Sequence, residues 1–297
     1  MLRCACIDIG SNTTRLLVAT DDGSRLRELF SERAFTRLGA ACGRDGEIGS
    51  DKVAEVASVV ARQVRIAHGL GVAALRVVAT AAVRQAANGP ALAAAIDEAC
   101  GVTLEILSSV EEARLAFAGA VGMLAEPPPG PLGVVDVGGG STELVVGTAA
   151  GGVTWSVSLP VGSSVVTDAD LPTDPPSSAE LARLRRKLAH VFAGVQAPRP
   201  TTAYAVGGSA TSLQRLVGSV LEREALARGL QALVTRPAVE IASRLGLHPE
   251  RARLLPAGIL LLDAASRALQ APLQLAGGGL REGVVLEQLA RLRAQPA

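Results

Sequence analysis

Short apolar runs alternate with longer amphipathic stretches along most of this chain. The short runs are rich in Val, Leu and Ile and predict β-strands. The longer stretches repeat apolar residues every three or four positions, with Asp, Ser or Pro near their starts, and predict α-helices. This alternation is typical of the α/β class. We expect strands at about 3–9, 14–20, 25–35, 74–79, 103–107, 132–137, 143–148, 152–159, 203–206 and 272–275. We expect helices at about 51–69, 90–99, 110–124, 178–194, 210–217, 222–246 in pieces, 249–269 in pieces and 280–293, with an irregular loop at 168–178.

The chain repeats itself once. Residues 6–18 (CIDIGSNTTRLLV) resemble residues 134–146 (VVDVGGGSTELVV) position for position. Each copy is an apolar run, an Asp, a polar or glycine-rich turn and a second apolar run, which predicts a tight β-hairpin with an Asp at its tip. The proline-rich segment 126–131 (EPPPGP) lies between the copies and marks a domain boundary. We therefore expect two related domains, residues 1–127 and 128–297, with a cleft between them.

Composition narrows the classes of function. A chain of 297 residues that is 48% hydrophobic can form two domains with cores. A net charge of +1 and an aromatic content of 2% argue against a nucleic-acid or membrane partner, so we expect any anion site to be local. The sequence reaches Asp8 and a polar turn too early for a signal peptide. The cysteines follow neither a disulfide framework nor zinc spacing, so we expect reduced thiols and a cytoplasmic location; they are Cys4, Cys6, Cys42 and Cys100.

Glycine-rich turns follow several predicted strands. In the second copy, residues 138–140 are three glycines that let the backbone approach an anion and direct amide groups at it. Asp136, just before this turn, can hold a metal ion. One such turn is often purely structural, but two copies would provide two phosphate-binding loops. Two further turns, at 205–211 and 275–283, each follow a strand and open a helix, where amides and the helix dipole favour anions. The pattern predicts a phosphate-rich ligand.

These hairpins and turns resemble the superfamily of actin, the Hsp70 chaperones and sugar kinases. Within it, the chain resembles the exopolyphosphatase and guanosine pentaphosphate phosphohydrolase family, through motifs that occur in the family's order. They lie at 8–15 (DIGSNTTR), 80–84 (TAAVR), 111–114 (EEAR), 136–143 (DVGGGSTE), 207–211 (GGSAT) and 280–283 (LREG). The resemblance implies two actin-like, ribonuclease H-like α/β lobes with an interdomain cleft, and a C-terminal helix at about 281–297 that packs back on the first lobe. Longer family members carry an additional C-terminal helical region, so the resemblance is to a short form.

The resemblance also implies roles for individual residues. Glu112 matches the glutamate thought to activate water, although its neighbour Glu111 stays open as the alternative, and from the residues alone both could form a solvated first helical turn. Arg84 matches an arginine that grips the scissile phosphate. Asp136 and Glu143 would hold a magnesium ion, with manganese as the alternative, and Glu143 would also serve catalysis. The expected phosphate-binding positions are Asp8, Gly10, Ser11, Asn12, Gly138, Gly139, Gly140, Ser141, Gly207, Gly208 and Ser209.

The expected activity is removal of the terminal phosphoryl group of inorganic polyphosphate by metal-assisted, in-line attack of water. Guanosine pentaphosphate (pppGpp), which would link the enzyme to the stringent response, is the alternative substrate; the lack of an aromatic cluster for a purine favours polyphosphate. An ATP-dependent kinase of the same superfamily is a more distant alternative, although small sugar kinases usually carry a Cys/His zinc motif that this sequence lacks. A nucleotide-gated protein without enzymatic activity would need added peptide-binding or polymer-contact segments. Related proteins are often dimers, so a homodimer is also open.

Overall fold

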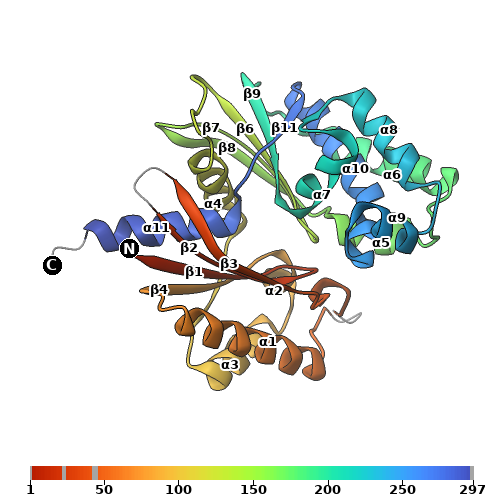
Figure 1. Ribbon diagram of the computed structural model, residues 1–297. Coiled ribbons are helices and arrows are strands. Elements are labelled where there is room, and N and C mark those ends of the chain that lie inside the picture. Colours follow the sequence, from red (N-terminus) through yellow and green to blue (C-terminus); the bar gives the residue numbers. More distant parts are fainter. Residues whose placement is uncertain (1, 22–24, 42–45, 295–297) are drawn as a thin grey trace. The chain divides into compact units, whose positions relative to one another are not determined.

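The computed structural model describes residues 2–21, 25–41 and 46–294 (Figure 1). It divides into two compact units, each with one β-sheet. The first unit comprises the chain up to Met123 together with the residues from Gly278 onward, and the second comprises Leu124–Gly277. The division falls just before the proline-rich segment at 126–131, and the last helix is grouped with the first unit.

The sheet of the first unit has five strands in the order β3-β2-β1-β4-β5. The duplicated hairpin forms β1 (Arg3–Ile9) and β2 (Thr14–Asp21), which pair antiparallel. On the other side of β1, β4 (Ala74–Ala79) pairs parallel to it. The two edges are β3 (Leu26–Ala34) and β5 (Leu104–Ile106). Its helices are η1 (Leu38–Ala41), α1 (Ser50–Gly69), α2 (Ala81–Gln85), α3 (Gly89–Cys100), α4 (Ser109–Gly122) and α11 (Leu280–Ala294).

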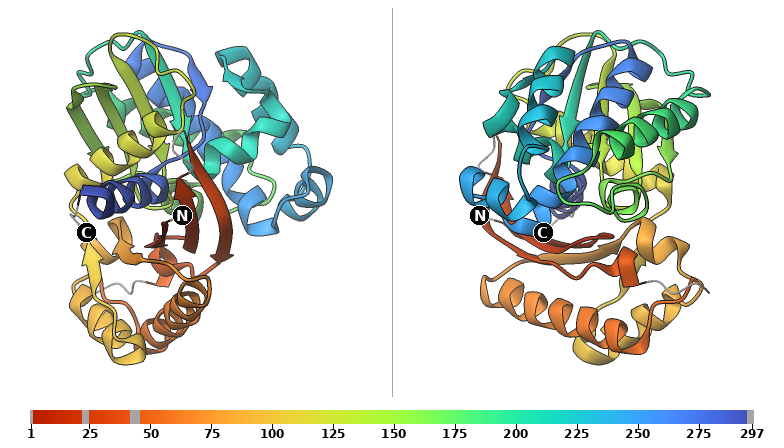
Figure 2. Two further views of the ribbon diagram at one scale, coloured as in Figure 1. Left: turned by 60° about the vertical axis from the view of Figure 1, so that its left-hand side comes forward. Right: turned by 90° about the vertical axis from the view of Figure 1, so that its right-hand side faces the viewer.

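Both faces of this sheet are covered by helices (Figure 2). Ala5 and Ile7 of β1 belong to a buried cluster with side chains of α1 and α3. Cys4 and Cys6 alternate with them and belong to a second cluster with side chains of α11. Because successive residues of a strand point to opposite faces, an apolar β1 is buried on both sides. Helix α11 packs on α4 as well as on β1.

The sheet of the second unit has six strands in the order β10-β11-β9-β6-β7-β8. The second copy of the hairpin forms β6 (Leu132–Val137) and β7 (Thr142–Thr148), and β9 (Thr202–Val206) runs parallel to β6. A continuous apolar core joins these strands to the helices of the unit. The remaining elements are β8 (Gly152–Leu159), α5 (Ser163–Asp170), α6 (Ser178–Phe192), α7 (Gly207–Val217), β10 (Val220–Leu221), α8 (Arg223–Leu233), α9 (Ala238–Leu245), α10 (Pro249–Leu269) and β11 (Leu273–Leu275).

The predicted elements match the structure except in short or proline-containing segments. Helices α2 and α5 and strand β10 are absent from the predictions because each is too short to have a clear period. Residues 249–269 form one continuous helix, not the pieces that we expected, although Pro256 lies inside it. Proline removes one hydrogen bond from a helix interior. Burial of most apolar side chains of α10 in the core of the second unit offsets that loss.

The expected irregular loop at 168–178 is shorter than predicted, since α5 extends to Asp170. The segment that follows contains a cis peptide bond between Asp174 and Pro175. The carboxylate of Asp174 accepts hydrogen bonds at 2.9 and 3.1 Å from the amide of Ala238, at the start of α9. The loop is therefore anchored to a helix terminus that would otherwise have an unpaired donor.

Among the helices within residues 2–21, 25–41 and 46–294, none is both long enough and apolar enough to cross a bilayer. Cys4, Cys6 and Cys100 are free thiols, and burial raises the pKa of each. Cys42 lies outside the described residues.

Candidate functional site

The two copies of the hairpin have the same turn. The amide of Gly10 donates to the carbonyl of Thr13 at 3.0 Å, and the amide of Gly138 donates to the carbonyl of Ser141, also at 3.0 Å. These bonds close four-residue turns at equivalent positions of the repeat. The duplication read from the sequence therefore extends to the backbone of both predicted phosphate loops.

The carbonyl groups of both turns are held by neighbouring backbone amides. In the first turn, the carbonyls of Ser11 and Asn12 accept hydrogen bonds from Gly39 and Arg37 at 2.7 and 3.0 Å. In the second, the carbonyls of Gly138 and Gly139 accept from the first residues of α5, at 2.8 to 3.1 Å. Carbonyl oxygens repel a phosphate, whereas amide groups attract it. With the carbonyls of these residues engaged elsewhere, both turns are suited to bind an anion through their amides.

The first turn also contains a buried donor that lacks a partner. The Nδ2 group of Asn12 forms no hydrogen bond within the part of the chain that the structure describes. A buried amide group without an acceptor is costly unless a ligand or water satisfies it. A phosphate oxygen at this turn would do so.

Asp136 and Glu143 lie directly opposite each other on β6 and β7, which places both carboxylates on one face of the sheet. Glu143 is only 2% exposed and accepts a hydrogen bond at 2.8 Å from the hydroxyl of Ser158 on β8. Oδ1 of Asp136 lies against the first turn of α7, where a Cβ on Gly207 would come within 2.3 Å of it. The backbone at Gly207 has a φ of +81°, so glycine is required there for both reasons.

A magnesium ion fits the donor chemistry of this pair. Within the described ranges, no cluster of three or more His, Cys, Asp or Glu side chains is arranged to hold a metal ion. Magnesium commonly uses one or two carboxylates and completes its octahedron with water and substrate phosphates. Asp136 and Glu143 supply hard oxygen ligands of that number, and manganese accepts the same ligands.

The third glycine turn forms the first turn of α7, three residues earlier than the helix start that we expected at 210. A Cβ on Gly208 would lie 2.7 Å from Nη2 of Arg251, so the guanidinium group rests directly on this backbone. Arg251 comes from the first turn of α10 and is 7% exposed. Ser209 is 1% exposed, and its side chain lies near Gly258 of α10. At this turn a phosphate would meet backbone amides and an arginine.

In the first unit, Arg84 and Glu112 form an ion pair. Nη1 of Arg84 donates to Oε2 of Glu112 at 2.9 Å and to the carbonyl of Leu107 at 2.7 Å. Glu112 is 8% exposed and lies in the first turn of α4, where the helix dipole favours a carboxylate. The Nε and Nη2 groups of Arg84 make no hydrogen bond to the described residues. Through these two groups, the guanidinium of Arg84 can bind an anion while it still contacts Glu112.

Glu111 has a different environment, although it is the next residue. Its carboxylate accepts two hydrogen bonds from Arg114, at 2.8 and 2.6 Å. These bonds, together with the charges of Arg114, Arg76 and Arg291, lower the pKa of Glu111. A carboxylate held in this way is a weak base, so the geometry favours Glu112 over Glu111 as the group that accepts a proton.

A row of charged residues crosses the first unit beside Asp8. In the sheet register Asp8 lies opposite Arg15, and Arg15 lies opposite Arg33. Burial raises the pKa of Asp8, while Arg281 and Arg15 act in the opposite direction. Burial, followed by the charges of Arg281 and Arg33, lowers the pKa of Arg15 to about 9. Arg281, on α11, has an acidic neighbour in Glu282, at 3.6 Å. The row has an excess of positive charge that an anion would neutralise.

Most predicted site residues thus fall into small groups within each unit. The structure pairs Arg84 with Glu112 in the first unit and Asp136 with Glu143 in the second. Sequence reasoning missed Arg33 and Arg251, and it assigned no role to Arg15 and Arg281, although these two lie within the motifs at 8–15 and 280–283. The positions of all four arginines beside the predicted site follow from strand register and from contacts with distant turns, which the local sequence does not contain.

Known proteins resemble the chain over nearly its whole length. It matches the model of the Ppx/GppA phosphatase family over residues 16–292. It is 31% identical to exopolyphosphatase 1 of Mycobacterium leprae, over 97% of this chain and 90% of that protein. It is 29% identical to exopolyphosphatase 2 of Mycobacterium tuberculosis, over 91% of this chain and 92% of that protein. The crystal structure of a Ppx/GppA family member from Aquifex aeolicus has a TM-score of 0.83 at 27% identity and covers 99% of each chain.

Proposed function

The chain belongs to the Ppx/GppA phosphatase family, and on that basis we propose that it is an exopolyphosphatase that releases orthophosphate from the end of inorganic polyphosphate. The family inferred from the six sequence motifs is confirmed, and so is the α/β fold class. The observation that carries the proposed reaction is the Arg84–Glu112 pair, in which a nearly buried carboxylate lies 2.9 Å from an arginine whose Nε and Nη2 groups bind no described residue.

Glu112 is the proposed base for the attacking water. Hydrolysis of a phosphoanhydride requires that this water lose a proton as it bonds to phosphorus. Without substrate, Arg84 neutralises Glu112. A terminal phosphate that binds the Nε and Nη2 groups of Arg84 would compete for the guanidinium charge and leave Glu112 more basic. The same arginine would stabilise charge on the phosphoryl group in the transition state.

The second unit is proposed to bind the metal ion and phosphates. Asp136 and Glu143 would hold magnesium, which supplies charge neutralisation for the phosphoryl oxygens when bound. Ser158 fixes the orientation of Glu143 through its hydrogen bond. The amides of the turn at 138–141 and of the first turn of α7 would bind neighbouring phosphates, with Arg251 beside them.

The balance of charges favours a polyanion over a nucleoside. Arg15, Arg33 and Arg281 provide positive charge in the first unit, and phosphate groups along a polymer could use it. A chain with 2% aromatic residues has few side chains for stacking on guanine. We therefore propose polyphosphate as the main substrate, pppGpp as the secondary one, and the cytoplasm, where thiols stay reduced, as the compartment.

A substrate panel tests this function. The purified protein is incubated with magnesium and polyphosphate, pppGpp, or ATP plus a set of sugars, and released orthophosphate is measured. We expect release from polyphosphate that stops when EDTA is added and returns with excess magnesium or manganese. Faster release from pppGpp would reverse the order of substrates, whereas release from neither polyphosphate nor pppGpp would refute the proposed hydrolase.

A further inference from the structure

Helix α11 packs on α4 through glycines. A Cβ on Gly119 of α4 would lie 1.9 Å from the carbonyl oxygen of Gly279, and a Cβ on Gly283 of α11 would lie 2.0 Å from the carbonyl oxygen of Leu115. No side chain fits at these positions, so the two segments touch backbone to backbone. Glu112 lies in the first turn of the same α4, and the position of α11 therefore bears directly on the proposed base.

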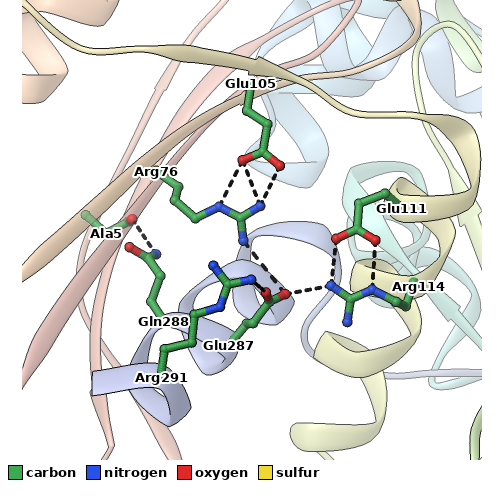
Figure 3. Close-up of polar contacts among 8 residues, drawn as sticks. All are labelled: Ala5, Arg76, Glu105, Glu111, Arg114, Glu287, Gln288 and Arg291. Carbon is green, nitrogen blue, oxygen red and sulfur yellow. Dashed lines mark hydrogen bonds and ion pairs between the residues drawn. The ribbon is translucent and has the colours of Figure 1, made fainter. Parts of the chain in front are cut away.

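One carboxylate of α11, that of Glu287, is the centre of an ion-pair network (Figure 3). Its Oε2 accepts a hydrogen bond from Arg114 of α4 at 2.6 Å and lies 3.8 Å from Nη1 of Arg76 on β4. Its Oε1 accepts a hydrogen bond from Arg291, one turn further along α11. The side chain of Glu287 is 19% exposed, so solvent screens these interactions less than at an open surface.

The arginines of the network have further partners that fix their orientation. Arg114 also binds Glu111 through two hydrogen bonds, and Arg76 binds both carboxylate oxygens of Glu105 at 2.8 Å. The three carboxylates and three guanidinium groups balance in charge, which suits a structural network better than a ligand site. Next to Glu287, Gln288 donates to the carbonyl of Ala5 on β1 at 2.9 Å and anchors α11 to the sheet.

Glu287 joins α4, which carries Glu112, to β4, the strand that precedes Arg84. Strand β4, which contains Arg76, leads directly into α2 and Arg84. Arg114 follows Glu112 by two positions on α4, so it points away from Glu112 toward α11. We propose that Glu287 is a positioning residue, which holds β4 and α4 so that Arg84 and Glu112 meet at 2.9 Å. This inference rests on the function proposed above.

Loss of the Glu287 charge should shift Arg84 and Glu112 relative to each other without unfolding the protein. In Glu287→Gln, Arg114 keeps Glu111 and Arg76 keeps Glu105, and the glycine contacts of α4 and α11 remain. The substitution removes the charged connection between α11, α4 and β4, together with the ion pair that Glu287 forms with Arg291 within α11. Because the proposed catalysis depends on geometry at Glu112, the effect should appear in kcat and not in KM.

The test compares Glu287→Gln and Arg114→Gln with Arg293→Gln. Arg293 lies on the same helix and forms one exposed ion pair with Asp21, at 2.8 Å. For polyphosphate hydrolysis, we expect the first two variants to lower kcat about tenfold with KM within about twofold, and the control to change neither. In a Glu112→Gln background, Glu287→Gln should cause a loss well below tenfold, because the part of its effect that passes through Glu112 is already absent. If Glu287→Gln folds poorly, Arg114→Gln tests the same connection at a half-exposed side chain.

Amide hydrogen exchange supplies a readout that does not depend on activity. We expect faster exchange in the first turn of α4 in Glu287→Gln and Arg114→Gln, and unchanged exchange there in Arg293→Gln. Unchanged kcat and exchange in both variants would overturn the positioning role. An undiminished, about tenfold loss of activity in the Glu112→Gln background would do the same, since an effect independent of Glu112 would indicate a general structural change. An unsubstituted protein that releases no orthophosphate would instead refute the proposed function.

Discussion

Arg15, Arg33 and Arg281 give the first unit a concentration of positive charge next to Asp8. Arg33 is the most accessible of them, and its pKa is lowered by burial and by Arg281. The positive charge of each arginine repels the charges of the neighbouring arginines, and a bound phosphate would relieve that repulsion. The row is therefore better explained as part of a polyanion site than as a contribution to stability.

Arg33→Gln should weaken binding of polyphosphate. We expect KM to rise about fivefold with kcat within about twofold, because a contact to a neighbouring phosphate is lost while the reacting groups are intact. The rate at low substrate should also become less sensitive to salt. Arg65→Gln, at an exposed arginine of α1, removes the same charge elsewhere in the unit and should leave KM unchanged. Equal KM values for the two variants would remove Arg33 from the proposed site.

Single residues could be predicted from the sequence only where a motif surrounds them. The Asp-turn pattern identified Asp8 and Asp136, and the resemblance of residues 111–114 to a family motif identified the Glu111–Glu112 pair without separating its members. Only their contacts distinguish the two glutamates. Glu112 forms an ion pair with Arg84, which lies 28 positions away in the sequence, whereas Glu111 is held by Arg114. Glu287 binds Arg114 across 173 positions, a relation that no local pattern contains.

Among the elements, the α4–α11 contact imposes the strictest limit on sequence. Gly119→Ala should destabilise the fold by about 3 kcal/mol or more, because the new Cβ forces two backbones apart. Gly69→Ala, at the end of α1, meets no atom within 4 Å and should leave stability unchanged or raise it by up to ~1 kcal/mol. Thermal unfolding followed by circular dichroism measures both. Similar melting temperatures for the two variants would contradict the backbone contact.

The start of α6 contains a pH-dependent cap. Hydrogen bonds from the Thr173 hydroxyl and from the Ser177 amide, the latter at 2.6 Å, lower the pKa of Glu180 to about 2. Because this carboxyl is more acidic in the folded state, its stabilising effect is complete above the ordinary pKa of 4.5 and is lost as pH falls toward 2. Glu180→Gln should lower the melting temperature at pH 7, and the difference from the unsubstituted protein should shrink below pH 4.5.

Glu224→Gln is the matched control for this cap. Glu224 lies exposed in the first turn of α8, so its substitution should leave the melting temperature nearly unchanged at every pH. A difference between Glu180→Gln and the unsubstituted protein that stays constant from pH 7 to pH 3 would contradict the cap.

Elements with a clear period could be predicted, and those fixed by packing could not. The hairpin strands and the long helices follow from alternation and from three-to-four spacing. Continuity of α10 through Pro256 depends on burial in the second unit, and α5 depends on bonds from its amides to the turn at 138–139. In both cases the stabilising contacts come from residues far away in the sequence, which a prediction from the local pattern does not include.

The two units contain copies of one hairpin, for which we propose two different roles. Both copies keep the Asp and the closed turn, but Asp8 faces Arg15 while Asp136 faces Glu143. The first copy has gained positive charge that suits an anion directly, and the second has gained a second carboxylate that suits a metal ion. The repeat itself was visible in the sequence. The proposed division of roles rests on the strand register and on the charges around each copy.

Glu112 is the proposed base that activates water for hydrolysis of terminal phosphoryl groups. The initial rate of orthophosphate release from polyphosphate, with saturating magnesium, measures this role in the unsubstituted protein, Glu112→Gln and Glu111→Gln. We predict a loss of about 100-fold or more in kcat for Glu112→Gln, because the base is removed, and a change of less than about threefold for Glu111→Gln. Orthophosphate release that survives in Glu112→Gln, or that is lost only in Glu111→Gln, would rule out Glu112 as the base.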